Sequence, residues 1–295
     1  MLGDYRVKAT AAGGSIRAIA AVTTTTARQV QMVHDASPVA AAALGRLMTA
    51  ASLLAADFKD QFRITVEVEG DGPLGRVVAE VRTGGLMRAR AEHPTVDLPL
   101  RSDGKLAVGQ AVGNQVILRV IREEMDRATY EGQAPIVSGE IGEDLANYYR
   151  TSEQIPAAVA LGVLVGRDGL VAASGGVVIQ ALPGIHEMTT DEVSEKFQKL
   201  HNISWRLSDG ETPEDLLREV LPGPIHWLST EPLEYRCHCS QERSLEIIGS
   251  LPDTDLNALI EEQGAEVVCH YCNTAYPISL IDLEQIRNKR ADTKD

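Results

Sequence analysis

The four cysteines of this 295-residue chain constrain its fold more than any other feature, because they are confined to one short stretch of sequence. Cys237 and Cys239 form a C-x-C pair, 29 residues follow, and Cys269 and Cys272 form a C-x-x-C pair. Two close pairs joined by one long loop are what a tetrahedral thiolate site needs, since each pair supplies one edge of the tetrahedron. The pattern predicts one Zn²⁺ ion bound by all four thiolates.

Other interpretations of the cysteines are weaker. Structural disulfides are disfavoured in a reducing compartment, and four unrelated buried thiols would have no reason to fall into spaced pairs. His238 and His270 lie inside the two pairs and remain alternative ligands, although four thiolates already complete the site. A catalytic zinc is disfavoured because a four-cysteine shell leaves no coordination position open for water.

The spacing of the first pair suggests that the site is built to come apart. Zinc knuckles usually place two residues between paired ligands, whereas Cys237 and Cys239 are separated by only one. Thiolates held by a metal remain nucleophilic towards oxidants, and a disulfide can no longer serve as a pair of ligands. A unit of roughly 60 residues is too small to lose the ~10–16 kcal/mol that a structural zinc contributes to folding. The four cysteines could therefore both stabilise the fold and sense oxidants.

The charge of the chain divides it into two parts. Residues 1–180 hold 18 basic and 20 acidic side chains, whereas residues 181–295 hold 10 and 22, which gives net charges of −2 and −12. A chain of 295 residues is long enough for about two domains of ~150 residues. An acidic protein lacks the positive surface that nucleic acids and anionic membranes require, so neither is an expected partner.

The first part of the chain is typical of an α+β fold. Its strands form hairpins around a few helices, which indicates a mixed or antiparallel sheet rather than a parallel doubly wound one. Helices are predicted at residues 38–56, after the N-cap Ser37, and at 139–154. Strands are predicted at residues 5–9, 16–22, 63–69, 76–81, 115–121, 159–165, 170–173 and 177–182, with Asp-Gly and Gly-Gly turns joining the last three.

The rest of the chain reads as a charged helical connector followed by a small unit. A capping box of Thr189 and Glu192 predicts a helix at 193–200, and Thr212-Pro213 opens a second one. The helices of this connector carry apolar residues along one face. The connector could be an ordinary linker or a regulated element. In the small unit, helices are predicted near residues 241–249, near 255–263 and from Ser279, with a strand at 266–268.

No sequence pattern indicates an enzyme. The segment Gly70–Gly75 matches G-x-G-x-x-G, but the strand-like residues after it and Pro73 within it favour a hairpin turn over a dinucleotide site. No G-x-x-x-x-G-K-[ST] motif supports use of ATP. Tyr148 and Tyr149 fit packing better than an active site. We also expect a cytoplasmic protein, because no signal peptide is visible and Arg46 interrupts the longest apolar run.

Together with the cysteines, further motifs resemble the heat shock protein 33 family of bacterial redox-regulated chaperones. The resemblance spans nearly all of the chain, and the cysteine spacing is its most specific part. The other motifs are Ala42-Ala43-Leu44-Gly45-Arg46, Gly72-Pro73-Leu74-Gly75, Val137-Ser138-Gly139-Glu140, Tyr148-Tyr149, Ser152-Glu153-Gln154-Ile155-Pro156, and Gly175-Gly176 leading to Gln180 and Pro183-Gly184.

The resemblance implies a function and a domain organisation. In that family the reduced protein binds zinc through the four cysteines and is inactive. Oxidation releases zinc and links neighbouring cysteines, here Cys237 with Cys239 and Cys269 with Cys272. The implied domains are an N-terminal α/β core (1–183), a metastable helical linker (184–232) and a C-terminal zinc-binding redox-switch domain (233–295).

The active form implied by the resemblance is an ATP-independent holdase, often a homodimer. It holds unfolding client proteins until ATP-driven chaperones refold them. Loss of zinc would unfold the small domain and free the apolar stripes of the connector for clients.

Two alternatives come from other classes of protein. A zinc-ribbon interaction module would keep a permanent structural metal and would retain it under peroxide. An oxidoreductase acting through the C-x-x-C pair would turn over a disulfide substrate, but no βαβ pattern surrounds the pair.

Overall fold

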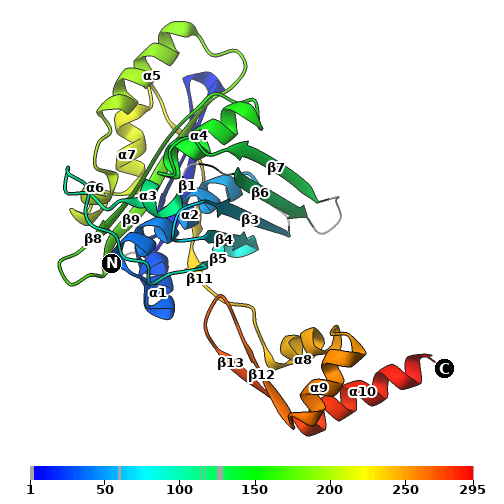
Figure 1. Cartoon of the computed structure of the whole chain (residues 1–295). Helices are drawn as coiled ribbons and strands as arrows, with labels where there is room; N and C mark the ends of the chain where they lie inside the picture. Colours follow the sequence, from blue (N-terminus) through cyan, green and yellow to red (C-terminus); the bar gives the residue numbers. More distant parts are fainter. Residues whose placement is uncertain (1–2, 59–60, 114, 116, 125–128, 295) are drawn as a thin grey trace. The chain divides into compact units, whose positions relative to one another are not determined.

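The structure is a computed structural model that describes residues 3–58, 61–113, 115, 117–124 and 129–294. The chain divides into two compact units, residues 1–236 and residues 237–295 (Figure 1). The first unit contains two sheets with helices, and the second contains a short hairpin with three helices. This arrangement confirms the predicted α+β fold class.

The first sheet of unit 1 has five strands, all paired antiparallel, in the order β10-β1-β2-β9-β8. The predicted hairpin at its centre is confirmed, because β1 pairs with β2 from Tyr5 opposite Val22 to Ala11 opposite Ile16. The 3-10 turn Ala12–Gly14 joins these two strands. The strand bounds are β1 Tyr5–Ala11, β2 Ile16–Val22, β8 Ala157–Val165, β9 Val171–Ala181 and β10 His226–Pro232.

The second sheet of unit 1 has six strands in the order β11-β5-β4-β3-β6-β7. All its pairs are antiparallel except β11 with β5. The predicted strand at 115–121 appears as β6, and residue 116 lies outside the described residues. The strand bounds are β3 Phe62–Glu69, β4 Arg76–Arg82, β5 Leu86–Ala91, β6 Ile117–Glu124, β7 Tyr130–Pro135 and β11 Glu234–Tyr235, with a 3-10 turn Thr83–Gly85 before β5.

Helix α2 (Pro38–Ala55) is the centre of this unit and contacts strands of both sheets. The Oγ of Ser37 accepts a hydrogen bond from the Ala40 amide, as the N-cap prediction required. Among the described residues only α2 has the length and composition of a membrane span, and 89% of it is buried inside the structure. It is therefore the core helix that its continuous apolar surface predicts. The other helices here are α1 (Thr24–His34), α3 (Val108–Val112) and α4 (Gly142–Thr151).

Three helices of the connector pack on the first sheet. They are α5 (Glu187–Lys199), α6 (Ile203–Ser208) and α7 (Pro213–Val220). Leu216, Leu217 and Val220 of α7 are fully buried in a cluster that includes Val7 and Ile16 of the sheet. Thr212 caps α7 as predicted, because its side chain accepts from the Asp215 amide. The connector thus has a buried apolar face inside unit 1.

The start of α5 differs from the prediction. The helix begins at Glu187 with His186 as its N-cap residue, and the amide of Thr189 donates to the His186 carbonyl. Thr189 is therefore inside the first turn, and the predicted capping box of Thr189 and Glu192 is wrong. The sequence analysis also did not predict helices α1, α3 and α6 or strands β5, β7, β10, β11 and β13.

The predicted Gly-Gly turn is also wrong, because Gly175 and Gly176 lie inside the continuous strand β9. A Cβ atom at Gly175 would lie 2.4 Å from the Ala21 carbonyl oxygen and 2.4 Å from the Leu207 side chain. A Cβ at Gly176 would lie 2.5 Å from Leu161 and 2.7 Å from the carbonyl oxygen of Ala160. These glycines therefore serve close packing, not chain reversal.

We expect Gly176→Ala to destabilise unit 1 by about 1–3 kcal/mol, because the added methyl group meets backbone and packed side chains. This clash outweighs the ~0.4–1 kcal/mol that a Gly-to-Ala change gains from the unfolded state. Urea unfolding followed by circular dichroism measures the difference. Gly142→Ala is the matched control, since its new Cβ would find only ordinary contacts at 3.8–3.9 Å. Equal midpoints for the two variants would contradict the packing role.

The second unit is built from α8 (Gln241–Gly249), α9 (Asp253–Glu261), the hairpin of β12 (Gly264–Val268) with β13 (Ala275–Ser279), and α10 (Leu280–Lys294). Its hydrophobic cluster contains four buried side chains, Ile248, Leu256, Ile278 and Leu283. So small a core is weak support for an independently folded unit.

Candidate metal centre

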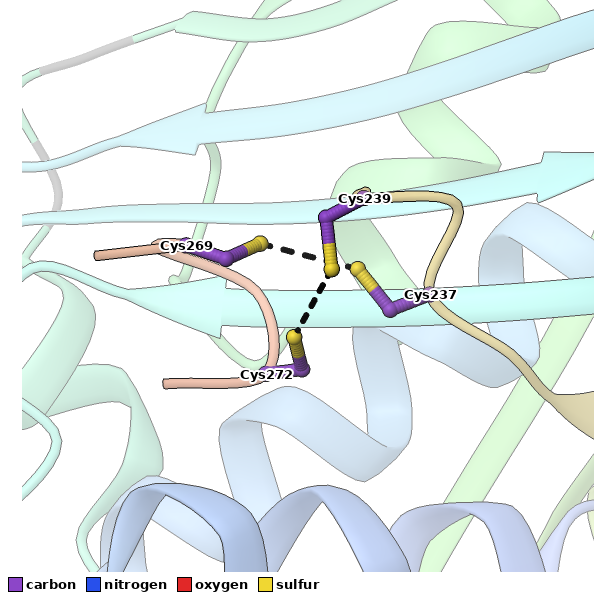
Figure 2. Close-up of side chains that lie close together, drawn as sticks. All are labelled: Cys237, Cys239, Cys269 and Cys272. Atoms are coloured by element: carbon purple, nitrogen blue, oxygen red, sulfur yellow. Dashed lines mark hydrogen bonds between the residues drawn. The ribbon is translucent and has the colours of Figure 1, made fainter. Parts of the chain in front are cut away.

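The four cysteines converge in the second unit, and their Sγ atoms all lie within 4.8 Å of one another. Cys237 and Cys239 come from the segment before α8, while Cys269 and Cys272 come from the turn between β12 and β13 (Figure 2). The turn is closed by hydrogen bonds from the Cys269 amide to the Thr274 carbonyl and from the Asn273 amide to the Cys269 carbonyl. Two segments of the chain therefore present two thiols each.

The distances between the sulfur atoms fit a tetrahedral metal site. Sγ of Cys237 lies 3.6 Å from Sγ of Cys269, and Sγ of Cys239 lies 3.2 Å from Sγ of Cys272. A disulfide would require ~2.05 Å, so these are separate thiols. Four sulfurs placed ~2.3 Å from a central zinc would be about 3.8 Å apart. The cluster needs only a small expansion to hold such an ion.

Two further side chains contact the sulfur atoms, and the sequence analysis identified neither. The hydroxyl of Tyr276 donates to Sγ of Cys239 at 3.0 Å, and Oγ1 of Thr274 lies 3.2 Å from Sγ of Cys272. Tyr276 is on β13, the strand that was not predicted, so no pattern placed it near a cysteine. Polar partners of this kind orient metal ligands and tune their basicity.

The protein surroundings shift the pKa values of Cys239, Cys269 and Cys272 in different directions. Burial raises the pKa of the Cys239 thiol to about 12, and burial also raises the pKa of Cys269. Burial acts in the same direction on Cys272, but hydrogen bonds from the Thr274 side chain and backbone outweigh it and bring that pKa to about 7. The surroundings thus favour ionisation of Cys272 over that of Cys239 and Cys269. Full deprotonation needs a nearby positive charge, which a divalent cation supplies.

Other residues singled out in the sequence lie elsewhere. Within the described residues the metal-binding group consists of the four cysteines, and neither His238 nor His270 joins it. Gly70–Gly75 forms the turn between β3 and β4, as predicted, and does not open a helix. Tyr148 is buried and donates to Glu153 at 2.6 Å, which is a packing role.

Known proteins share both the sequence and the fold. The family model described as "Hsp33 protein" matches residues 4–279. The chain belongs to the Hsp33 family. Its members include the "33 kDa chaperonin" of Staphylococcus epidermidis, which is 39% identical over 97% of this chain and 98% of its own length. The protein of the same name from Staphylococcus aureus is 41% identical over 94% of this chain and 95% of its own length.

A solved Hsp33 structure agrees with the fold. The crystal structure of the 33 kDa chaperonin of Thermotoga maritima superposes with a TM-score of 0.90 at 31% identity, covering 99% of this chain and 100% of that one. The predicted resemblance to this family is therefore confirmed. Membership of a chaperone family implies that the chain binds client proteins.

Proposed function

We propose that this Hsp33 chain is a redox-regulated holdase whose switch is the cysteine cluster. The observation that carries the proposal is that the four thiols bring the start of the second unit against its β12–β13 turn, in a unit whose described hydrophobic cluster has four buried side chains. A unit with so small a core depends on the cluster for its fold. A chemical change at the sulfur atoms, such as oxidation, then switches the unit between folded and unfolded states.

In the reduced state we assign one Zn²⁺ ion to Cys237, Cys239, Cys269 and Cys272. The donor set supports this choice, because four thiolates in tetrahedral reach are the preferred shell of structural zinc. A bound divalent ion would supply the positive charge that lets all four thiols ionise. Tyr276 and Thr274 hold the sulfurs of Cys239 and Cys272 in orientation. In this state the proposed protein is inactive.

Oxidation removes the ligands. In each cysteine pair two thiolates form one S–S bond and give up two electrons, which hydrogen peroxide accepts together with two protons to form two molecules of water. We propose the pairings Cys237–Cys239 and Cys269–Cys272. A cross-pair disulfide would close a loop of more than thirty residues and stabilise the unit by roughly 3–4 kcal/mol. Within-pair disulfides leave the unit without that crosslink, so it unfolds.

Unfolding then extends to the connector. The chain enters the cluster directly after β11, a strand of two residues held to β5, and β10 precedes it on the edge of the first sheet. These elements follow α7 along the chain, so loss of the cysteine unit removes the anchor on their C-terminal side. Release of α5 to α7 exposes their apolar faces and the sheet surface beneath them. Both are suited to holding unfolding proteins.

The proposed domains are a core of residues 1–183, a metastable linker of 184–232 and a redox-switch domain of 233–295. The partners are unfolding proteins and the ATP-dependent chaperones that receive them. The active form is a homodimer, acts in the cytoplasm, uses no ATP and catalyses no reaction.

The test follows metal content and chaperone activity in one sample. Reduced, zinc-loaded protein is treated with peroxide at mild heat, while a chromogenic chelator reports zinc release and light scattering reports aggregation of a heat-unfolded model protein. We expect zinc release and suppression of aggregation to rise together, and both to reverse with a thiol reductant and added zinc. Zinc retained under peroxide would support a structural zinc-ribbon module instead.

A further inference from the structure

Strand β8 is an unusual edge strand. It ends the five-stranded sheet, and its nine residues, AAVALGVLV, are all partly exposed and uncharged. Proteins usually protect an edge with charged residues, proline, a bulge in mid-strand or a very short strand, because unpaired backbone groups recruit other strands. The only irregularity of β8 is at its end, between Leu164 and Val165. Most of this edge therefore lacks the features that usually prevent pairing.

The backbone groups available for pairing follow from the ladder with β9. The amide of Ala181 donates to the carbonyl of Pro156, and antiparallel pairs alternate along the strand, so the backbone groups of Leu161 and Val163 point away from β9. A Cβ on Gly142 would lie 3.8 Å from the Leu161 nitrogen, so the start of α4 lies against the middle of β8. The open stretch of edge is the half that follows Leu161.

A groove of about 710 Å³ runs beside this half of β8. Residues 160–166 line it, together with α6 and the segment that contains Leu100 and Leu106. Trp205 of α6 and Leu100 both line the groove while 57% and 60% of their surfaces remain exposed. Large apolar side chains beside an open edge offer contacts to alternate side chains of an added strand.

The charged side chains that line the groove indicate which charge its ligand carries. Arg46, Lys105 and Arg167 line the groove, and no acidic side chain does. Arg46 pairs with Glu140 at 2.5 Å, whereas Lys105 and Arg167 are exposed and form no ion pair with the described residues. A positive rim is notable in a chain of net charge −14. It complements carboxylates that flank an apolar segment.

We propose that this groove binds an extended apolar polypeptide segment with acidic flanks, added as a strand to the free half of β8. The edge supplies backbone hydrogen bonds, Trp205 and Leu100 supply apolar contact, and Lys105 and Arg167 orient the flanks. All of these residues belong to unit 1, and the groove is formed while α6 packs on the first sheet. The site is therefore present in the reduced protein, before oxidation releases the connector. It is distinct from the apolar faces that oxidation exposes.

The test uses reduced, zinc-loaded full-length protein and a labelled peptide of alternating valine and threonine with a glutamate at each end. We expect saturable binding by fluorescence anisotropy, and a change in Trp205 fluorescence in a Trp227→Phe background. Lys105→Glu and Arg167→Glu should each weaken binding about fivefold, while Arg287→Glu, an exposed charge reversal in unit 2, should leave it unchanged. Trp205→Ala should weaken it by more than about tenfold.

Pairing through the backbone is tested with the same peptide N-methylated at alternate residues, which removes its donors towards β8. Loss of binding supports strand addition, and equal binding overturns it. A concentration-dependent dimer that Lys105→Glu abolishes, without peptide binding, would assign the edge to a second copy and overturn the proposed occupant. Because the reduced protein is used, these outcomes are independent of whether oxidation activates a holdase.

Discussion

Removing one cysteine ligand should unfold the second unit while the first remains folded. In Cys272→Ser the cluster loses a thiolate, and most of the ~10–16 kcal/mol apparent contribution of a structural zinc is lost with it. That exceeds what a cluster of four buried side chains supplies, since whole domains have net stabilities of only about 5–15 kcal/mol. Amide hydrogen exchange measures the effect. The amides that pair β12 with β13 should lose protection, while those pairing β3 with β4 should keep it.

Thr254→Ser is the matched control for this variant, because Thr254 is exposed on α9 in the same unit and its replacement keeps a hydroxyl group. It should leave both sets of amides protected. Treating the unsubstituted protein with a chelator under reducing conditions should reproduce the Cys272→Ser pattern without any disulfide. If the amides of β12 and β13 stayed protected from exchange after chelation, the metal would not be what keeps this unit folded. The proposed switch would then be wrong.

Local sequence patterns were enough for the elements whose residues carry their own signal. The β1–β2 hairpin has alternating apolar residues and two glycines, and α2 has Ser37 and Pro38 at its start. Both are determined within a few residues. The cysteine cluster was predictable for the same reason, because ligand spacing within each pair is a local property. The alternation of side chains in β3 and β4 likewise identified the turn between them.

Several of the features that were missed or misassigned depend on distant partners. Strand β10 has exposed Trp227 and Leu228 in succession and no alternation, and it forms only because β1 offers it an edge. Gly175-Gly176 looks like a turn locally, but the carbonyl of Ala21 and the side chain of Leu161 require glycine inside a strand. Tyr276 reaches Cys239 across 37 positions of sequence. Such tertiary contacts override local propensity and leave no pattern to read.

The connector offers a way to separate release of the linker from oxidation. Leu217 on α7 is fully buried in the cluster between the connector and the first sheet. Truncating a buried leucine to alanine costs about 2–5 kcal/mol, which is a large share of the energy that docks three short helices. We therefore expect Leu217→Ala to suppress aggregation of a heat-unfolded model protein while it is still reduced and zinc-loaded. Limited proteolysis should show faster cleavage within residues 187–220.

Met188→Ala is the matched control, because it makes a similar large-to-small change on α5 at a side chain that is 76% exposed. It should remain inactive until oxidised. Zinc content must stay at one ion per chain in both variants, so that activity cannot arise from a damaged cluster. The smaller cavity of Val220→Ala gives an intermediate release if Leu217→Ala disrupts unit 1 as a whole.

The contrary result is equally definite. A variant whose connector is cleaved rapidly, whose zinc is retained and whose β3–β4 amides stay protected, yet which does not suppress aggregation, would show that the apolar faces of α5 to α7 do not hold clients. Client binding would then have to depend on the oxidised cysteine unit itself. If release alone produces activity, the cysteine cluster acts on clients only through the docking of the connector, and oxidation supplies the free energy that undocks it.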